Sequence, residues 1–99
     1  MTNDEMRILR RAVDAYGTRR QTVKVLEELG ELTQALCKRL GGDDDRKTLD
    51  HLYEEIADVE IMLAQLRVMT GADKDIDRWI ALKIARLKER LDAAEAMTP

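Results

Sequence analysis

Apolar residues recur every three or four positions along most of the chain, which is the spacing of amphipathic helices. Glycines interrupt this pattern at three places and separate four periodic segments. The pattern predicts an all-α fold with helices at about residues 4–16, 18–40, 46–69 and 73–96. Because the connections are short, we expect consecutive helices to pack antiparallel in one four-helix bundle that forms a single domain over residues 1–99.

Polar residues at the starts of the segments suggest how the helices begin. Thr18 and Gln21 have the spacing of a capping box, with a hydroxyl at the cap and an amide three residues later. The aspartate run at 43–45 can supply a cap for the third helix, and Asp73 or Asp75 can cap the fourth.

The apolar stripes differ between the segments. The second segment has one stripe, formed by Val25, Leu29, Leu32, Leu36 and Leu40, and so has the fourth, formed by Ile76, Ile80, Ile84, Leu87, Leu91 and Ala94. The third segment carries apolar residues on nearly all sides: Ile56, Val59, Ile61, Met62, Leu63, Leu66, Val68 and Met69. A bundle of 99 residues can hardly cover such a helix. We therefore expect the third helix to lie against a second copy of the chain in a homodimer.

Composition narrows the classes of function. The chain has 37% charged residues, a net charge of -3 and no basic block, so general nucleic-acid binding is not expected. No apolar run is long enough for a membrane span and no signal-peptide pattern opens the chain, which predicts a cytoplasmic protein. The single cysteine, Cys37, allows no intrachain disulfide, and its apolar neighbours predict a small core residue.

A short repeat carries acidic residues. The segments 27–32 and 54–59 both follow the order acid, acid, apolar, small, acid, apolar. Glu28 and Glu31 lie on one face of the second helix because they are three residues apart, and Glu55 and Asp58 do the same on the third. Two antiparallel helices could aim both pairs at one point.

The surroundings of these acids favour a bound cation. Glu55 and Asp58 share their side of the third helix with apolar residues that we expect to be covered, and uncompensated burial of a carboxylate costs several kcal/mol. Gly30 costs about 1 kcal/mol in a helix interior, and its counterpart in the repeat is Ala57. Small residues at both places would let the helix backbones approach closely. Oxygen ligands alone favour Mg²⁺, with Mn²⁺ as a substitute.

Other polar residues have simpler expected roles. Glu27 and Glu54 point away from the apolar stripes and are expected to face solvent. Glu60 falls on an apolar face without a metal role, and Arg67 is a candidate ion-pair partner for it. The only histidine, His51, is expected at the surface without a catalytic role.

Basic residues on the fourth helix offer a complementary charge. Lys83, Arg86 and Arg90 are spaced three and four apart and form one face beside the apolar stripe. They are candidates for binding a polyphosphate held by the acids. They are also compatible with solvated charges whose stems cover apolar surface.

The acidic motif resembles a known family. Glu27-Glu28-x-x-Glu31, followed by 23 residues and Glu55-x-x-Asp58, is similar to the EExxE…ExxD signature of the all-α nucleoside triphosphate pyrophosphohydrolases. This group includes MazG, the dimeric dUTPases and the dCTP pyrophosphatase-like proteins. The segments 54–63 and 83–91 look most like short MazG-like proteins, and the resemblance covers about residues 18–91.

The resemblance implies a fold and an activity. It implies a MazG-like α-helical domain that forms dimers or dimers of dimers, with sites near the subunit interfaces. It also implies hydrolysis of an NTP or dNTP to the monophosphate and pyrophosphate, by attack of a metal-activated water on the α-phosphorus. In this chain Glu28, Glu31, Glu55 and Asp58 match the catalytic Mg²⁺ ligands.

Two other functions stay open at this stage. One is a non-enzymatic dimeric interaction module in which the acids are surface charge, and the other is a metal-binding bundle without turnover. The preferred base is also open, because only Trp79, Tyr53 and Tyr16 can stack on a base.

Overall fold

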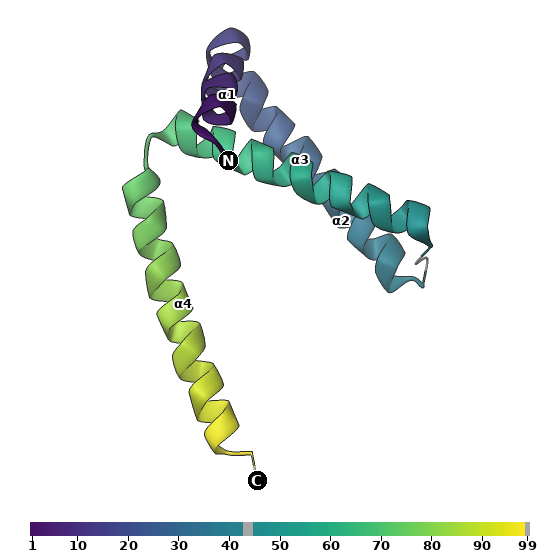
Figure 1. Ribbon diagram of the computed structural model, residues 1–99, viewed down its shortest axis with the longest axis vertical. Coiled ribbons are helices and arrows are strands. Elements are labelled where there is room, and N and C mark those ends of the chain that lie inside the picture. The colour runs from purple at the N-terminus through teal and green to yellow at the C-terminus, as the bar shows by residue number, and fades with distance from the viewer. Residues whose placement is uncertain (43–44, 99) are drawn as a thin grey trace.

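The protein is built from four helices joined by short turns. The computed structural model describes residues 1–42 and 45–98, and that part of the chain contains no strand. Two residues of the predicted aspartate cap, Asp43 and Asp44, lie outside the described part. The helices are α1 (Asn3–Tyr16), α2 (Thr18–Leu40), α3 (Arg46–Thr70) and α4 (Asp73–Ala96), shown in Figure 1. The all-α prediction is therefore confirmed. No helix in the described residues is long and apolar enough to cross a membrane.

Gly17, Gly71 and Asp45 mark helix boundaries as the sequence predicts. Gly17 ends α1 with a φ of 86°, and Gly71 ends α3 in the left-handed region with a φ of 64°, a region that favours glycine. Asp45 caps α3, because its side chain accepts a 2.7 Å hydrogen bond from the Thr48 amide.

The predicted caps of α2 and α4 are wrong. Gly17 is the N-cap of α2, so Thr18 already lies inside the helix and makes no cap with Gln21. Ala72 is the N-cap of α4 and offers no side-chain acceptor. Asp73 and Asp75 instead lie in the first turn of α4, where their charges interact favourably with the helix dipole.

α2 and α3 form an antiparallel pair that α1 joins at one end. α1 lies against the C-terminal half of α3 and contacts α2 as well (Figure 1). The buried apolar residues come from these three helices: Leu9, Val13, Val25, Ala35, Val59 and Met62. Among the described residues none falls below 2% exposure, so the core of the single chain is thin.

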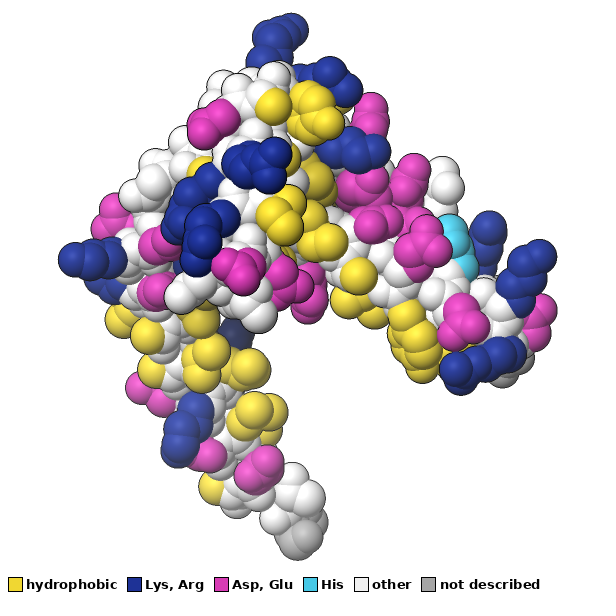
Figure 2. Space-filling view, turned by 45° about the horizontal axis from the view of Figure 1, so that its top comes forward, with side chains coloured by type: hydrophobic (Ala, Val, Ile, Leu, Met, Phe, Trp, Pro, Cys, Tyr) yellow, Lys and Arg dark blue, Asp and Glu magenta, His cyan; other side chains and the backbone are white. Residues whose placement is uncertain are grey.

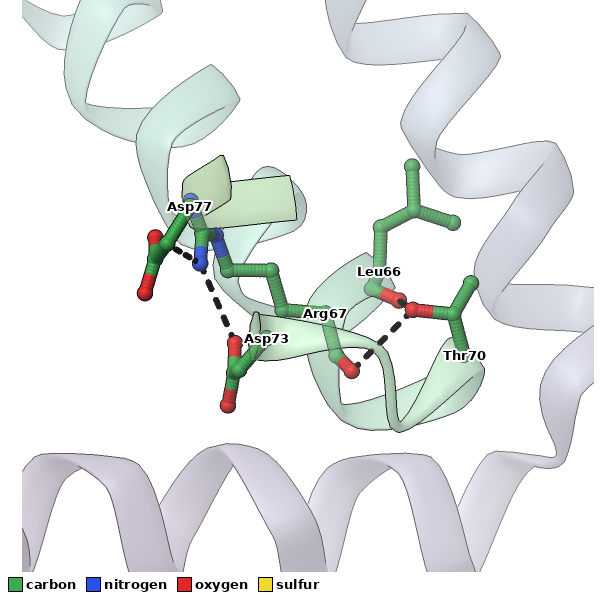
Figure 3. A network of polar contacts seen from close by, with 5 residues as sticks. All are labelled: Leu66, Arg67, Thr70, Asp73 and Asp77. Carbon is green, nitrogen blue, oxygen red and sulfur yellow. Dashed lines mark hydrogen bonds and ion pairs between the residues drawn. The ribbon is translucent and has the colours of Figure 1, made fainter. Parts of the chain in front are cut away.

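α4 does not join the bundle, which corrects the predicted four-helix packing. It leaves α3 at a corner and projects away from the other helices (Figure 1), and it contains no buried residue. Arg67 fixes the corner by pairing with Asp73 at 3.2 Å and Asp77 at 2.9 Å (Figure 3). Arg67 therefore pairs across the corner rather than with Glu60. A short connection gives antiparallel packing only where the next helix finds an apolar surface in its own chain.

Apolar surface is consequently exposed along most of the chain. Figure 2 shows hydrophobic side chains along the arm formed by α4, where Ile84 is 60% and Leu91 50% exposed. Leu36 on α2 and Leu63 on α3 are also more than two-fifths exposed. The radius of gyration is 17.5 Å, whereas a compact chain of this length has about 13 Å. Cys37 is exposed, so the predicted core position is wrong for the single chain.

A buried amide pair joins the start of α2 to α3. Gln21 and Gln65 are each 5% exposed, and the Gln21 side-chain nitrogen donates a 2.7 Å hydrogen bond to the Gln65 side-chain oxygen. Buried amides are costly unless they are hydrogen-bonded, so each side chain depends on the other.

We predict strong coupling between these two glutamines. Gln65→Leu should lower the free energy of unfolding by about 1–3 kcal/mol, because Gln21 loses its partner. Gln21→Leu with Gln65→Leu should cost clearly less than the sum of the single changes. Urea unfolding of the four proteins measures the coupling. Simple additivity would show that the hydrogen bond contributes nothing to stability.

Candidate metal site and the adjoining groove

Three of the four predicted acidic ligands meet between α2 and α3. Glu28, Glu31 and Glu55 each place one carboxylate oxygen within 4.8 Å of the others. Glu28 and Glu55 are only 6% and 3% exposed, whereas Glu31 is exposed. The repeat thus brings acids from two helices to one place, as the sequence predicts.

Each buried carboxylate has one oxygen paired and one oxygen without a partner. Glu28 is 3.1 Å from the Lys24 ammonium, and Glu55 is 3.7 Å from the His51 imidazole. The second oxygen of each, Oε2, is buried and accepts no hydrogen bond. Such oxygens are expensive in a protein interior unless something binds them. The three acids are therefore a group that could hold a cation.

The pKa values of two further acids, the exposed Glu31 and the half-buried Asp58, are raised at this site. Repulsion by Glu28 is the main cause that raises the pKa of Glu31 above its usual value, together with a hydrogen bond to Glu28. The pKa of Asp58 is raised by partial burial first, and then by the charges of Glu28 and Glu54. Asp58 thus lies near the cluster, although it is not among the three acids that converge within 4.8 Å.

Glu27 and Glu54 face solvent as predicted, whereas Glu60, expected on an apolar face, is exposed as well. Glu27 pairs with Lys24 at 3.6 Å. Glu54 nevertheless joins a second group, in which ligand atoms of His51, Glu54 and Glu55 lie within 4.8 Å of one another. His51 is at the surface, with 48% of its side chain exposed, but it borders the acidic site.

The expected close approach of the helices at Gly30 is wrong. A Cβ atom at this position would meet no atom within 4 Å, and the corresponding Ala57 is exposed. The two helices hold their acids together without contact at these small residues. Gly30 therefore serves no packing purpose in the single chain.

The basic face of α4 is not brought to the acids within one chain. Lys83, Arg86 and Arg90 line a shallow hollow on α4 together with Glu89. α4 runs away from the middle of α2 and α3, where the acids lie (Figure 1). The predicted contact between these residues and a polyphosphate at the acids is therefore not formed within the single chain.

A groove that the sequence did not predict adjoins the acids. It is open, has a volume of about 840 Å³ and lies between α1, α2 and α3. Arg19, Arg20 and Lys24 line it, and Tyr16 stacks beneath the Arg20 guanidinium at 4.4 Å from the ring centroid. Lys24 connects the groove to the acids through its ion pair with Glu28.

Two local spacings could have revealed Lys24 and His51 as neighbours of the acids. Lys24 precedes Glu28 by four residues and His51 precedes Glu55 by four, the spacing at which helical ion pairs form. The groove itself has no such signal, since it depends on how α1 packs across the α2–α3 pair.

The donor set of the site suits a hard divalent cation. Three converging carboxylates offer oxygen ligands only, which fits Mg²⁺ and Mn²⁺. The neighbouring group adds an imidazole nitrogen, which transition metals such as Mn²⁺ also accept. The residues present thus fit the cation that the sequence predicts.

Comparison with known proteins adds no assignment. The chain matches no protein-family model, no curated protein and no solved structure. The site is a cluster of buried and exposed carboxylates between two antiparallel helices, bordered by a groove that Arg19, Arg20, Lys24 and Glu27 line.

We predict that neutralising Asp58 stabilises the metal-free protein. Its raised pKa means that the folded state disfavours the charged form, so Asp58→Asn should raise the melting temperature at neutral pH. For the same reason, acidification through the folded-state pKa should remove this penalty in the wild type, and the variant should gain less from it.

Thermal melts with a chelator present, at several pH values, provide the measurement. Glu60→Gln is the matched control, because Glu60 is an exposed acid on the same helix. A lower melting temperature for Asp58→Asn than for Glu60→Gln would contradict the electrostatic account of the cluster.

Proposed function

We propose that the chain is a Mg²⁺-dependent nucleoside triphosphate pyrophosphohydrolase of the MazG-like kind. One observation supports this proposal above the rest. Glu28 and Glu55, on adjacent helices, are more than nine-tenths buried, and each keeps an unpartnered oxygen beside Glu31. A purely structural role would leave this free energy cost without compensation.

The carboxylates have a defined task in this proposal. Glu28, Glu31 and Glu55 would hold Mg²⁺, and Asp58, which lies near them, would complete the ligand set. Bound Mg²⁺ would convert a site that repels phosphates into one that attracts them, and it would lower the pKa of water. Without the cation, four clustered acids would repel any polyphosphate.

The proposed reaction exchanges one phosphoanhydride bond for a bond to water. A water oxygen attacks the α-phosphorus of an NTP or dNTP, and the bond from the α-phosphorus to the oxygen that bridges the α- and β-phosphates breaks. Pyrophosphate leaves, the nucleoside monophosphate retains the water oxygen, and the proton passes to solvent. The rigid α2–α3 pair positions the reacting groups, since the buried acids cannot rotate freely.

We further propose that the protein works as a homodimer or a dimer of dimers. The thin core and the exposed apolar stripe of α4 support this assembly, because large apolar surfaces on soluble proteins mark interfaces. A partner chain would also supply the Lys83, Arg86 and Arg90 face that a single chain holds away from its own acids.

The exposed α4 stripe also favours a second candidate function, a non-enzymatic helical interaction module. Trp79, Ile84 and Leu91 would then contact a partner, and the acids would have no catalytic task. The two candidates differ in one respect that can be measured: only the enzyme turns over a nucleotide in the presence of Mg²⁺.

We expect an NTP and dNTP panel with Mg²⁺ to give a monophosphate and pyrophosphate, without diphosphate or orthophosphate. Removing Glu28, Glu31, Glu55 or Asp58 by amide substitution should lower kcat/KM by about 10²–10³-fold. Glu60→Gln serves as the control for a lost charge outside the site.

Hydrolysis in ¹⁸O-labelled water locates the attack. The label should appear in the monophosphate, as seen by mass spectrometry. Label in pyrophosphate would move the attack to the β-phosphorus, and the absence of any Mg²⁺-dependent turnover over the whole panel would refute the enzyme in favour of the interaction module.

We predict that the protein is at least dimeric at micromolar concentration. Light scattering should give a mass of a dimer or larger rather than the 11.4 kDa of the single chain. Ile84→Glu should shift the population toward monomer, because an interface would bury an unpaired carboxylate. Lys88→Ala, at an exposed charged position of the same helix, is the control. A monomeric wild type would overturn the proposed assembly.

A further inference from the structure

We propose that the groove between α1, α2 and α3 binds the two phosphates that leave the substrate as pyrophosphate. This inference rests on the proposed function for its substrate, but the groove and its charges stand independently of it. The groove would take the part of a triphosphate that lies beyond the α-phosphate, with Arg19, Arg20 and Lys24 as its cationic ligands.

The groove and the acids lie along one face of α2. Arg20, Lys24 and Glu28 are spaced four residues apart, so each is about 6 Å further along the helix than the one before it. Lys24 lines the groove and also pairs with Glu28. A polyphosphate whose α-phosphate sits at the acids would therefore reach Lys24 first and Arg20 next.

Arg19 and Arg20 do not stabilise α2, the helix on which they lie. Arg19 and Arg20 lie in the first turn of α2, which contains no acidic residue. Cations are unfavourable at a helix N-terminus, since the helix dipole is positive there. The N-cap, Gly17, provides no side-chain hydrogen bond either. An anion bound by these arginines would relieve the unfavourable charge at the helix N-terminus, which is the behaviour expected of a functional position.

The stacking of Arg20 prepares it for a phosphate. Its guanidinium lies 4.4 Å from the centroid of the Tyr16 ring, which fixes the plane of the group. A stacked guanidinium keeps its N–H donors at the edge, where they can bind phosphate oxygens in pairs. Tyr16 is thus a positioning residue for Arg20.

Lys24 can pair either with carboxylates or with a phosphate in the groove. In the structure its ammonium lies 3.1 Å from Glu28 and 3.6 Å from Glu27, and the pairing with Glu28 raises its pKa. A divalent cation on Glu28 would compete for the same carboxylate. Lys24 would then pair with the phosphates that arrive with the cation. The cation would balance the charge of Glu28, and Lys24 would balance part of the phosphate charge.

The groove fits phosphates better than the basic face of α4 does. The residues Lys83, Arg86 and Arg90 lie on a helix that its own chain holds away from the acids. One groove residue, Lys24, already pairs with Glu28 in the single chain. In a dimer both sets could contribute, but the groove is the nearer of the two.

Calorimetric titration of the full-length protein with inorganic pyrophosphate in the presence of Mg²⁺ tests the proposal without any catalytic step. Arg19→Ala and Arg20→Ala should each weaken binding about tenfold, which corresponds to about 1.4 kcal/mol. Arg20→Lys should recover part of the loss. Arg46→Ala, a basic position at the far end of α3, is the control and should bind as the wild type does.

Thermal melts of each variant show whether it is folded, so that lost binding is not confused with unfolding. Unchanged affinity in a folded Arg20→Ala protein would overturn the proposal. So would displacement of pyrophosphate by a free nucleoside, since the groove would then hold the base. Weakening by Lys83→Ala and Arg86→Ala with no effect of Arg20→Ala would assign the phosphates to α4 instead.

The same measurements separate this inference from the proposed function. A protein that hydrolyses no nucleotide, but still loses pyrophosphate in Arg20→Ala, would refute the enzyme and support the anion site. A protein that hydrolyses nucleotides with an unchanged KM in Arg20→Ala would support the enzyme and refute the groove.

Discussion

The antiparallel pairing of α2 with α3 is the constraint on which the rest of the structure depends. This pairing buries Val25, Val59 and Met62, and it also buries Glu28 and Glu55. The apolar residues stabilise the pair by leaving water, whereas the carboxylates oppose it. Lys24 offsets part of that opposition by ion pairing with Glu28 from within the same helix. The pair is thus held together by apolar contacts and left electrostatically incomplete.

The two other helices, α1 and α4, differ in how they meet the α2–α3 pair. α1 closes one end, where the amides of Gln21 and Gln65 meet in the interior. α4 contributes no buried residue and leaves its stripe, including Ile84 and Leu91, exposed. One chain therefore has clustered acids whose charge is not balanced and a core that is not complete. A cation would remove the first deficit, and a second chain would remove the second.

The helices were predictable because their signals are local. Periodic apolar residues and the glycines at 17 and 71 determine where each helix runs, and each depends only on near neighbours in the sequence. The meeting of Glu28 with Glu55 was predictable for a similar reason, since a repeated motif on two adjacent helices needs only antiparallel packing. The packing of α4 was not predictable, because an apolar stripe does not specify which surface covers it. The buried glutamine pair and the groove depend on the placement of α1, which no short motif encodes.

The corner between α3 and α4 has a different physical character from the three-helix part. It is held by the charges of Arg67, Asp73 and Asp77, and the side chains of both aspartates are about two-thirds or more exposed. Dissolved ions weaken such exposed pairs most at high salt, because the Debye length falls to about 3 Å at 1 M ionic strength. The hydrogen bond between the side-chain amides of Gln21 and Gln65 is neutral and buried, so added salt leaves it intact. Ionic strength therefore acts on the direction in which α4 points while leaving the acid-bearing helices in place.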